Sequence, residues 1–345
     1  MTSSRSQTVI GDDKFHDIIR SRMPDTQKET VDVLGKLKST YIECGRDRLL
    51  RKNFKEFQEV VLATKEGTNT RVEGDAFYLV GESGSGKTRT VRHLLEANEL
   101  LQLIPTQTGT IHLWASISLH GPGTLKTLGM KILKATGYVG KGLEEGTLWA
   151  MLPEHLHSVG VLLIHIDETQ HMLRYSEKNR EELSNALKSV MNDEVWPVSF
   201  LLSGMPRTTE LIRRDTQTER RQFVFDLPRV DVEEERVLIE RIIERMCEVA
   251  KVGVGEVIDS DIPDRIAHAA RYQYGRISQV VFAALHAALN EKLEGKKVLT
   301  RDHFAQAYIN HSHARGYDDV NPFLVDDWME LDEGLFIFDR SHHDA

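Results

Sequence analysis

The sequence predicts an α/β protein in which helices cover both faces of a parallel sheet, followed by a small helical domain. Short apolar runs alternate with amphipathic stretches in the middle of the chain, and strands that alternate with helices form parallel sheets. A glycine-rich octapeptide at residues 81–88 directly follows the first apolar run. After Pro228 the apolar residues recur only at helical spacing, which predicts the second domain.

The length and composition fit a main domain with a smaller appendage, and they argue against a membrane-spanning segment. With 345 residues, 40% of them hydrophobic, the chain can bury a sizeable core. No apolar run approaches the roughly 18 residues that cross a bilayer, and the first residues lack the apolar stretch of a secretory signal. Its two cysteines have no metal-like spacing, which is typical of a reducing compartment. We therefore expect a cytoplasmic protein without a membrane partner.

The net charge of −9 is concentrated near the C-terminus. Residues 314–345 hold nine acidic residues and two arginines, so the remainder of the chain is close to neutral. The overall acidity therefore does not exclude a nucleic-acid surface elsewhere.

Five segments are expected along the chain. Residues 1–26 are polar with little periodicity and are expected to form a flexible arm, and residues 27–70 are expected to form an N-terminal helical segment. The α/β core is assigned to 71–228, the small helical domain, called the lid below, to 229–312 and an acidic-aromatic tail to 313–345.

Strands and helices of the core and lid follow from the spacing of apolar residues. Apolar runs predict core strands at 76–80, 110–114, 159–166, 198–202 and 222–227. Helical spacing predicts core helices at 88–101, 124–135 and 183–190, and lid helices at 237–249, 262–272, 277–293 and 301–310.

The octapeptide Gly81-Glu82-Ser83-Gly84-Ser85-Gly86-Lys87-Thr88 matches the phosphate-loop (Walker A) pattern. Its glycines let backbone N–H groups turn inward around phosphate oxygens, and the next helix adds its positive end. Lys87 would reach the β- and γ-phosphates, and the Thr88 hydroxyl would ligate magnesium. We assign this loop and Arg89 to a site for ATP and Mg²⁺. The alternative is an ordinary glycine turn.

Two carboxylates, Asp167 and Glu168, end the most apolar strand. At the carboxyl end of a central strand, Asp167 can hold the magnesium shell (Walker B), and Glu168 can act as general base toward the attacking water. The alternative is a buried strand that ends in a solvated acidic turn.

Further polar residues follow the later strands. Ser203 can hydrogen-bond the hydrolytic water or the γ-phosphate, unless Gly204 and Pro206 mark a simple loop. Arg276 opens a predicted lid helix after Gly275 and could swing over the nucleotide, or be an ordinary exposed residue. An arginine presented to a neighbouring subunit could stabilise transition-state charge; the candidates are Arg220 and Arg221, with Arg213 and Arg214 nearby, and the alternative is a solvated helix face.

Together these residues resemble an AAA+ ATPase, from about residue 50 to residue 312. The Asp-Glu-x-x-His form at 167–171, the Ser-Gly-x-Pro at 203–206 and the Gly-Arg-Ile-Ser at 275–278 are most similar to TniB/TnsC transposition regulators, which are relatives of MuB. ExeA-type and Orc/Cdc6-like ATPases share much of this pattern. The resemblance implies an ATP-dependent homo-oligomer, a ring or helical filament, on double-stranded DNA. It further implies that the oligomer links a target-selector protein to a transposase, and that hydrolysis disassembles it.

Two basic groups are candidate DNA contacts, although a solvated helix face explains either. One is on the predicted helix 124–135, with Lys126, Thr127 and Lys131. The other lies near the N-terminus and consists of Arg46, Arg48, Arg51, Lys52 and Lys55. No DNA-reading motif is present, so binding should be sequence-tolerant and salt-sensitive.

The tail interleaves aromatic residues with its acids. These aromatics could anchor a partner protein or fold back over the lid; they are Tyr317, Phe323, Trp328, Phe336 and Phe338. Two other functional classes stay open beside the transposition regulator. An initiator or loader ATPase would carry a DNA-binding domain after the lid, where only about 30 residues are seen. A signalling ATPase would use the same core without DNA.

Overall fold

The computed structural model describes residues 12–107, 109–121, 124–174, 177–209, 222–291, 295–311 and 318–334. Contacts divide the chain into two units, which are described separately here. The sheet unit consists of residues 43–230 and 273–276, and the helical unit of residues 1–42, 231–272 and 277–345. The expected segment 27–70 is thus shared between the two units.

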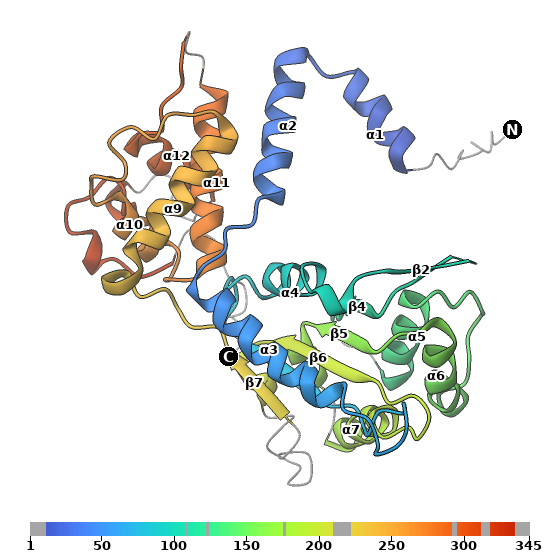
Figure 1. The fold of residues 1–345 in the computed structure, drawn as a ribbon. Coiled ribbons are helices and arrows are strands. Elements are labelled where there is room, and N and C mark those ends of the chain that lie inside the picture. The colour runs from blue at the N-terminus through green and yellow to red at the C-terminus, as the bar shows by residue number, and fades with distance from the viewer. Residues whose placement is uncertain are drawn as a thin grey trace, which may run out of the picture. The chain divides into compact units, whose positions relative to one another are not determined.

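A five-stranded parallel sheet forms the centre of the sheet unit, in the order β4-β5-β6-β1-β7 (Figure 1). Strands β1, β5 and β6 are buried along their whole length, as expected for strands with neighbours on both sides. The strands are β1 Ala76–Val80, β4 Trp114–Ser118, β5 Leu163–Asp167, β6 Ser199–Gly204 and β7 Gln222–Asp226. The predicted fold class, an α/β P-loop core with N- and C-terminal helices, is confirmed.

The strand expected at 110–114 is wrong in position. Gly109–Ile111 (β3) pairs instead with Ile104–Thr106 (β2) in a separate antiparallel hairpin. The sheet strand β4 begins at Trp114 and contains two serines, so it carries no continuous apolar run. An edge strand tolerates such polar residues because it pairs on one side only.

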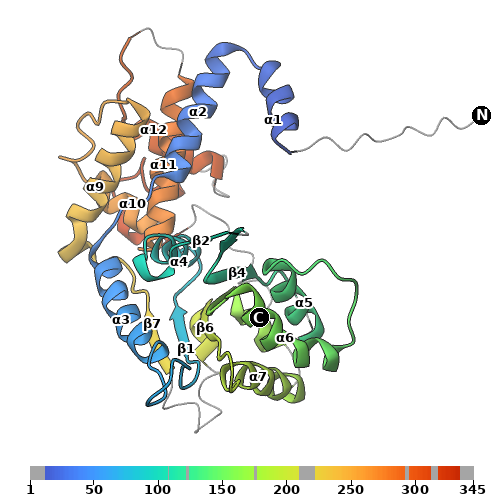
Figure 2. The same ribbon diagram turned by 45° about the vertical axis from the view of Figure 1, so that its right-hand side comes forward.

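Helices cover both faces of the sheet, as Figures 1 and 2 show. Gly45–Val61 (α3) and Lys87–Glu96 (α4) pack on the face that carries Phe77, Leu79 and Leu201. The opposite face is covered by α5 Leu125–Ala135, α6 Glu145–Val159 and α7 Glu177–Met191. The sequence interpretation did not include α6. Its buried leucines recur every four residues, but Pro153 inside the helix reads as a helix breaker.

Helices build the second unit. Asp25–Ser39 (α2) packs against Val232–Ala250 (α9), and Ile262–Ala269 (α10), Tyr274–Asn290 (α11, whose first turn belongs to the sheet unit) and Arg301–His311 (α12) follow. Asp12–Ser21 also forms a helix (α1), which differs from the flexible arm expected for 1–26. Arg20 in its last turn interacts favourably with the negative C-terminal end of the helix dipole and pairs with Asp32 of α2 at 2.6 Å. Among the described residues, none of the helices has the length and apolar character needed to cross a membrane.

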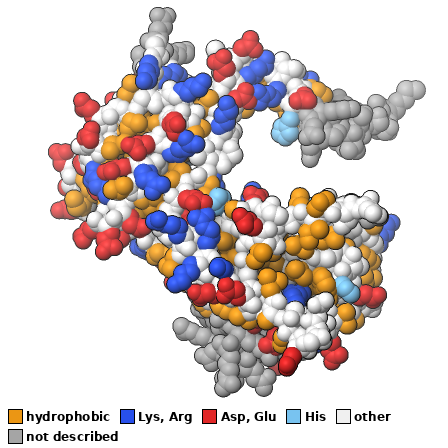
Figure 3. Space-filling model, in the orientation of Figure 1, with side chains coloured by type: hydrophobic (Ala, Val, Ile, Leu, Met, Phe, Trp, Pro, Cys, Tyr) orange, Lys and Arg blue, Asp and Glu red, His pale blue; other side chains and the backbone are white. Residues whose placement is uncertain are grey.

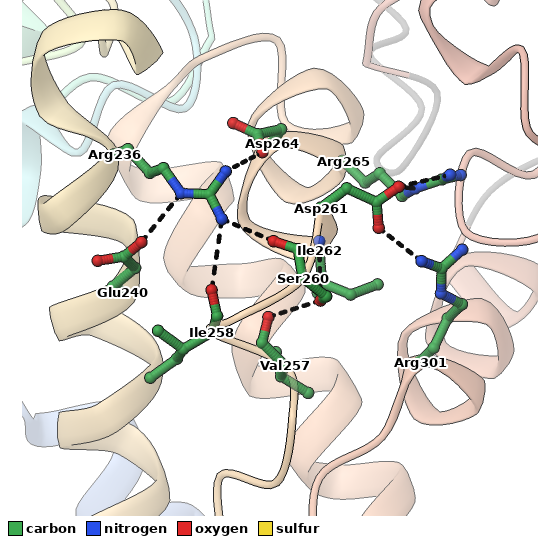
Figure 4. Close-up of polar contacts among 10 residues, drawn as sticks. All are labelled: Arg236, Glu240, Val257, Ile258, Ser260, Asp261, Ile262, Asp264, Arg265 and Arg301. Carbon is green, nitrogen blue, oxygen red and sulfur yellow. Dashed lines mark hydrogen bonds and ion pairs between the residues drawn. The ribbon is translucent and has the colours of Figure 1, made fainter.

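Ion pairs join α9, α10 and α12 (Figure 4). Arg236 of α9 donates to Glu240 at 3.0 Å, to Asp264 of α10, and to the Ser260 carbonyl at 2.6 Å. Asp261 accepts from Arg265 at 2.8 Å and from Arg301 of α12 at 2.5 Å. Asp264 in α10 therefore connects this helix to α9, and Asp261, directly before α10, connects it to α12.

The described part of the tail, residues 318–334, covers the helical unit itself. Phe323 is fully buried and stacks on Phe304 of α12 with ring centres 5.5 Å apart. Arg265 donates to the Pro322 and Val325 carbonyls, each at 2.5 Å, and Trp328 is buried beside His268. For Phe323 and Trp328 the tail thus folds back over the lid instead of offering free anchors. Tyr317, Phe336 and Phe338 lie outside the described residues.

Candidate nucleotide-binding site

The loop of residues 81–88 joins β1 to α4. Gly86 caps α4 with a φ of 94°, a left-handed conformation that glycine adopts without steric cost. Lys87 is buried, and its ammonium donates to the Gly81 carbonyl at 2.8 Å and to the Glu82 carbonyl at 2.9 Å. Burial lowers the pKa of Lys87, while Glu168, Asp167 and Glu82 oppose that shift. The loop thus surrounds a cation at a helix N-terminus, an arrangement suited to phosphate.

Asp167, at the end of β5, is held by three donors. The Thr88 hydroxyl donates to its Oδ2 at 2.6 Å, the Ser203 hydroxyl to its Oδ1 at 2.5 Å, and the Glu168 N–H to its Oδ1 at 3.0 Å. Parallel strands bring these residues to one edge, although 79 positions separate Thr88 from Asp167. A hydroxyl and a carboxylate are the oxygen donors that Mg²⁺ accepts, so Thr88 and Asp167 fit a magnesium site.

Glu168 has a φ of 60°, which is uncommon for a residue other than glycine. Such backbone strain concentrates at functional sites, where the surrounding structure enforces it. The Glu168 carboxylate accepts from the Gln170 amide, whose oxygen accepts from the Met205 N–H at 3.2 Å. Gln170 therefore links the expected base to the loop after β6, a role that its sequence position did not reveal.

His165 is a buried residue of the site that the motifs do not include. Its Nδ1 lies 2.8 Å from the Ser116 hydroxyl and its Nε2 lies 2.8 Å from the Ser203 hydroxyl. Burial lowers the pKa of His165 to about 4, although Asp167 opposes the shift. The signal in the sequence was one polar residue inside the apolar run of β5.

Arg46, expected in the second basic group, lies at the phosphate loop and is 8% exposed. Its Nη2 donates to the Ser85 carbonyl at 3.1 Å, and its guanidinium lies 3.9 Å from the centre of the Tyr274 ring. Among the described residues, its Nε and Nη1 have no hydrogen-bond partner. Because it is buried, Arg46 does not belong to a solvated DNA-facing group.

Other members of that group remain on the surface. Arg48, Lys52 and Lys55 are exposed, and basic side chains lie over the region of α3 in Figure 3. Arg51 is instead engaged by Glu43, at 2.7 and 2.8 Å.

The start of α11 lies against the loop. The Arg276 N–H donates to the Gly84 carbonyl at 3.1 Å, and the residue is 4% exposed. Glu82 accepts from Arg229 at 3.0 and 3.1 Å and from Gln273 at 2.9 Å. The structure therefore brings Arg276 to the phosphate loop, while its predicted action on the nucleotide stays a prediction.

The remaining predicted residues are not gathered at this site. Lys131 donates to the Ser118 carbonyl at 2.7 Å, Thr127 is bonded to the helix-capping Thr124, and Lys126 lies 3.7 Å from Glu144. Arg89 is an exception, because it follows Thr88 in the first turn of α4, and its side chain is exposed. Four predicted arginines lie outside the described residues: Arg213, Arg214, Arg220 and Arg221.

A family match and similar solved structures support the core fold. Residues 71–212 match the protein family described as AAA domain. No curated protein matches the chain. Among solved structures, the ORC2 protein of Aeropyrum pernix with ADPNP and ADP is 19% identical, with a TM-score of 0.55, covering 79% of this chain and 69% of its own.

Two further structures have the same fold. The ORC1 protein of Aeropyrum pernix, in complex with DNA, is 19% identical with a TM-score of 0.55, covering 83% of this chain and 71% of its own. The Cdc6p protein of Pyrobaculum aerophilum is 14% identical with a TM-score of 0.54, covering 79% and 69%. These likenesses show the parallel-sheet P-loop fold of AAA+ proteins.

Proposed function

We propose that this chain, with its AAA domain and its Orc/Cdc6-like fold, is an ATPase that assembles on double-stranded DNA and regulates transposition. The observation that carries the ATPase is the set of hydrogen bonds from Thr88 and Ser203 to Asp167, beside the buried ammonium of Lys87. The residues proposed to hold phosphate, metal and water thus lie at one edge of the sheet.

In this proposal the phosphate loop and the ends of β5 and β6 carry the reaction. The loop N–H groups and Lys87 would hold the β- and γ-phosphates, and Thr88 and Asp167 would hold Mg²⁺. Bound there, the metal would neutralise charge on the phosphate oxygens. Glu168 would take a proton from a water molecule as its oxygen bonds to the γ-phosphorus. The bond to the bridging oxygen breaks, and ADP and phosphate leave.

The DNA-dependent part rests on the narrower resemblance. The motif forms at 167–171, 203–206 and 275–278 resemble those of TniB/TnsC regulators, and the similar ORC1 structure is a complex with DNA. In this proposal Lys126, Thr127 and Lys131 meet DNA phosphates, and Arg220 or Arg221 reaches the nucleotide of a neighbouring copy. The partners are a transposase and a target-selector protein.

An initiator-like or loader-like ATPase is the second candidate. It is favoured by the similarity to the ORC1, ORC2 and Cdc6p structures over about four-fifths of this chain. The two candidates differ in what they form on DNA. A regulator that polymerises gives assemblies whose length follows the DNA, whereas an initiator gives discrete complexes.

Hydrolysis and assembly are tested with Lys87→Ala and Glu168→Gln. We expect Lys87→Ala to abolish ATP binding, and Glu168→Gln to bind ATP but hydrolyse it about 10²- to 10⁴-fold more slowly. Lys141→Ala and Glu59→Gln are matched controls, because both side chains are exposed and the Glu59–Lys55 pair, 3.9 Å apart, contributes little. Unchanged hydrolysis in Glu168→Gln would show that another group is the base.

Negative-stain images of the protein with duplex DNA test the assembly. With a non-hydrolysable ATP analogue the wild type should form regular filaments or rings. Glu168→Gln should form them with ATP itself, and Lys87→Ala should form none. Single particles under every condition would contradict the DNA-assembly proposal.

A further inference from the structure

His165 lies on the sheet face that carries the catalytic edge. His165 pairs in register with Ser116 of β4. It lies two residues before Asp167 in β5, so the side chains of His165 and Asp167 point to the same face of the sheet. That face is the one covered by α3 and α4. Ser203 of β6 completes a row of polar side chains across three neighbouring strands.

The direction of the hydrogen bonds in this row follows from elementary valence. A carboxylate can only accept, so the bond between Ser203 and Asp167 uses the single hydroxyl hydrogen of Ser203. The Ser203 oxygen must then accept from His165, at 2.8 Å. Nε2 of His165 therefore carries a hydrogen, whatever the state of Nδ1.

This arrangement fixes the rotation of the Ser203 hydroxyl. Without the donor from His165, the hydroxyl could turn about its C–O bond and point its hydrogen away from Asp167. With the donor present, Oδ1 of Asp167 stays bonded to Ser203, and Oδ2 faces Thr88 at 2.6 Å. A polar ring in the middle of a buried strand is costly unless both nitrogens are satisfied, as they are here.

We infer that His165 is a positioning residue for the magnesium ligand Asp167, acting through Ser203. The inference rests on the proposed ATPase function. It adds a residue that the phosphate-site motifs leave out, and it gives Ser203 a different task, which is to orient a carboxylate instead of contacting phosphate. Ser116, exposed on the edge strand, forms the outer end of the row.

Two amide variants separate positioning from packing. In His165→Gln the amide nitrogen can reach the position of Nε2, so this variant keeps a donor to Ser203. In His165→Asn the shorter amide reaches only the position of Nδ1, so the donor to Ser203 is lost. His165→Leu removes both. Steady-state ATP hydrolysis gives kcat and KM, and binding of a fluorescent ATP analogue at varied Mg²⁺ gives the metal dependence without turnover.

We expect His165→Leu and His165→Asn to lower kcat and to raise the Mg²⁺ needed for half-maximal analogue binding, each about 10- to 100-fold. His165→Gln should recover most of both values, and the KM for ATP should change least. Ser116→Ala should stay within about threefold of wild type, because water can replace an exposed hydroxyl.

Equal behaviour of His165→Gln and His165→Asn, or wild-type values for His165→Leu, would overturn the inference. If His165→Leu does not fold, as judged by its thermal melt, the comparison of the two amide variants decides. A wild-type protein that neither binds nor hydrolyses ATP would instead refute the proposed function. The two failures are therefore distinct.

Discussion

Gly275 lies where two backbone segments approach too closely for a side chain. A Cβ at this position would be 2.5 Å from the Gly84 carbonyl oxygen and 3.1 Å from the Gly86 nitrogen. Because both neighbours are backbone atoms of the phosphate loop, they cannot give way without moving the loop.

Gly275→Ala should therefore weaken nucleotide binding. Overpacking costs about 1–3 kcal/mol, and we expect a loss of affinity of about 5- to 150-fold in a fluorescence titration with an ATP analogue. Gly142→Ala is the matched control, since its Cβ would meet nothing within 4 Å. An unchanged affinity in Gly275→Ala would mean that the loop moves at no cost.

Glu43 gives a stability that depends on pH. A hydrogen bond from Arg51, and to a smaller extent one from His93, lowers the pKa of Glu43 from an ordinary value of 4.5 to about 2. Because the folded-state pKa is depressed, the contribution to the free energy of unfolding is present above pH 4.5 and is lost as the pH falls toward 2.

Glu43→Gln should lower the free energy of unfolding at pH 7 by about 0.5–1 kcal/mol, a modest value because the pair is half-exposed. The difference from wild type should shrink as the pH falls below about 4.5. Urea unfolding at about pH 7 and about pH 3.5 measures it, with Glu59→Gln as control. A difference that is constant between these pH values would argue against this origin.

Among the elements, the strands with a continuous apolar run could be predicted from the sequence, and the edge strand β7 is one of them. The apolar runs of β1, β5 and β6 predict these strands within a few residues. Strand β4 could not be placed, because this edge strand carries serines instead of a continuous apolar run. Helix α6 was not predicted, because a proline inside a helical pattern suggests that the helix ends there. Helix α1 forms an ion pair with α2, between Arg20 and Asp32, and a local pattern does not contain such a contact.

The same limit applies to the site. The phosphate loop and Asp167-Glu168 are contiguous motifs, so the sequence predicts them directly. The role of His165 depends on Ser116, 49 positions away, and that of Arg46 on Ser85, 39 positions away. Pairing of this kind becomes visible only when strands and helices are placed in space.

The segment 318–334 behaves as an element of the helical unit. Phe323→Ala should remove a fully buried ring from its contact with Phe304, at a cost of about 3–5 kcal/mol. We expect faster hydrogen exchange of the amides in α10 and α12. Leu324→Ala, at a neighbouring residue that is 45% exposed, should change exchange little. Equal protection in both variants would show that the segment is dispensable.

Over the whole molecule, the chain passes between its two units four times, after Ile42, Val230, Tyr272 and Arg276. Close to each passage, a residue of the sheet unit bonds to the phosphate loop. Arg46 donates to Ser85, Arg229 and Gln273 to Glu82, and Arg276 to Gly84. A residue near each of the four connections thus forms a hydrogen bond with the octapeptide that is proposed to bind phosphate.

The bonds to Glu82 also bear on how this protein can change during evolution. The phosphate-loop pattern leaves position 82 open to any residue. Here its carboxylate accepts from Arg229 and Gln273, which belong to different connections, so a substitution of Glu82 removes an acceptor that the two share. In related sequences that keep these bonds, we therefore expect positions 82, 229 and 273 to change together. Position 82 is free in the phosphate-loop pattern, but its two partners would constrain it in this protein.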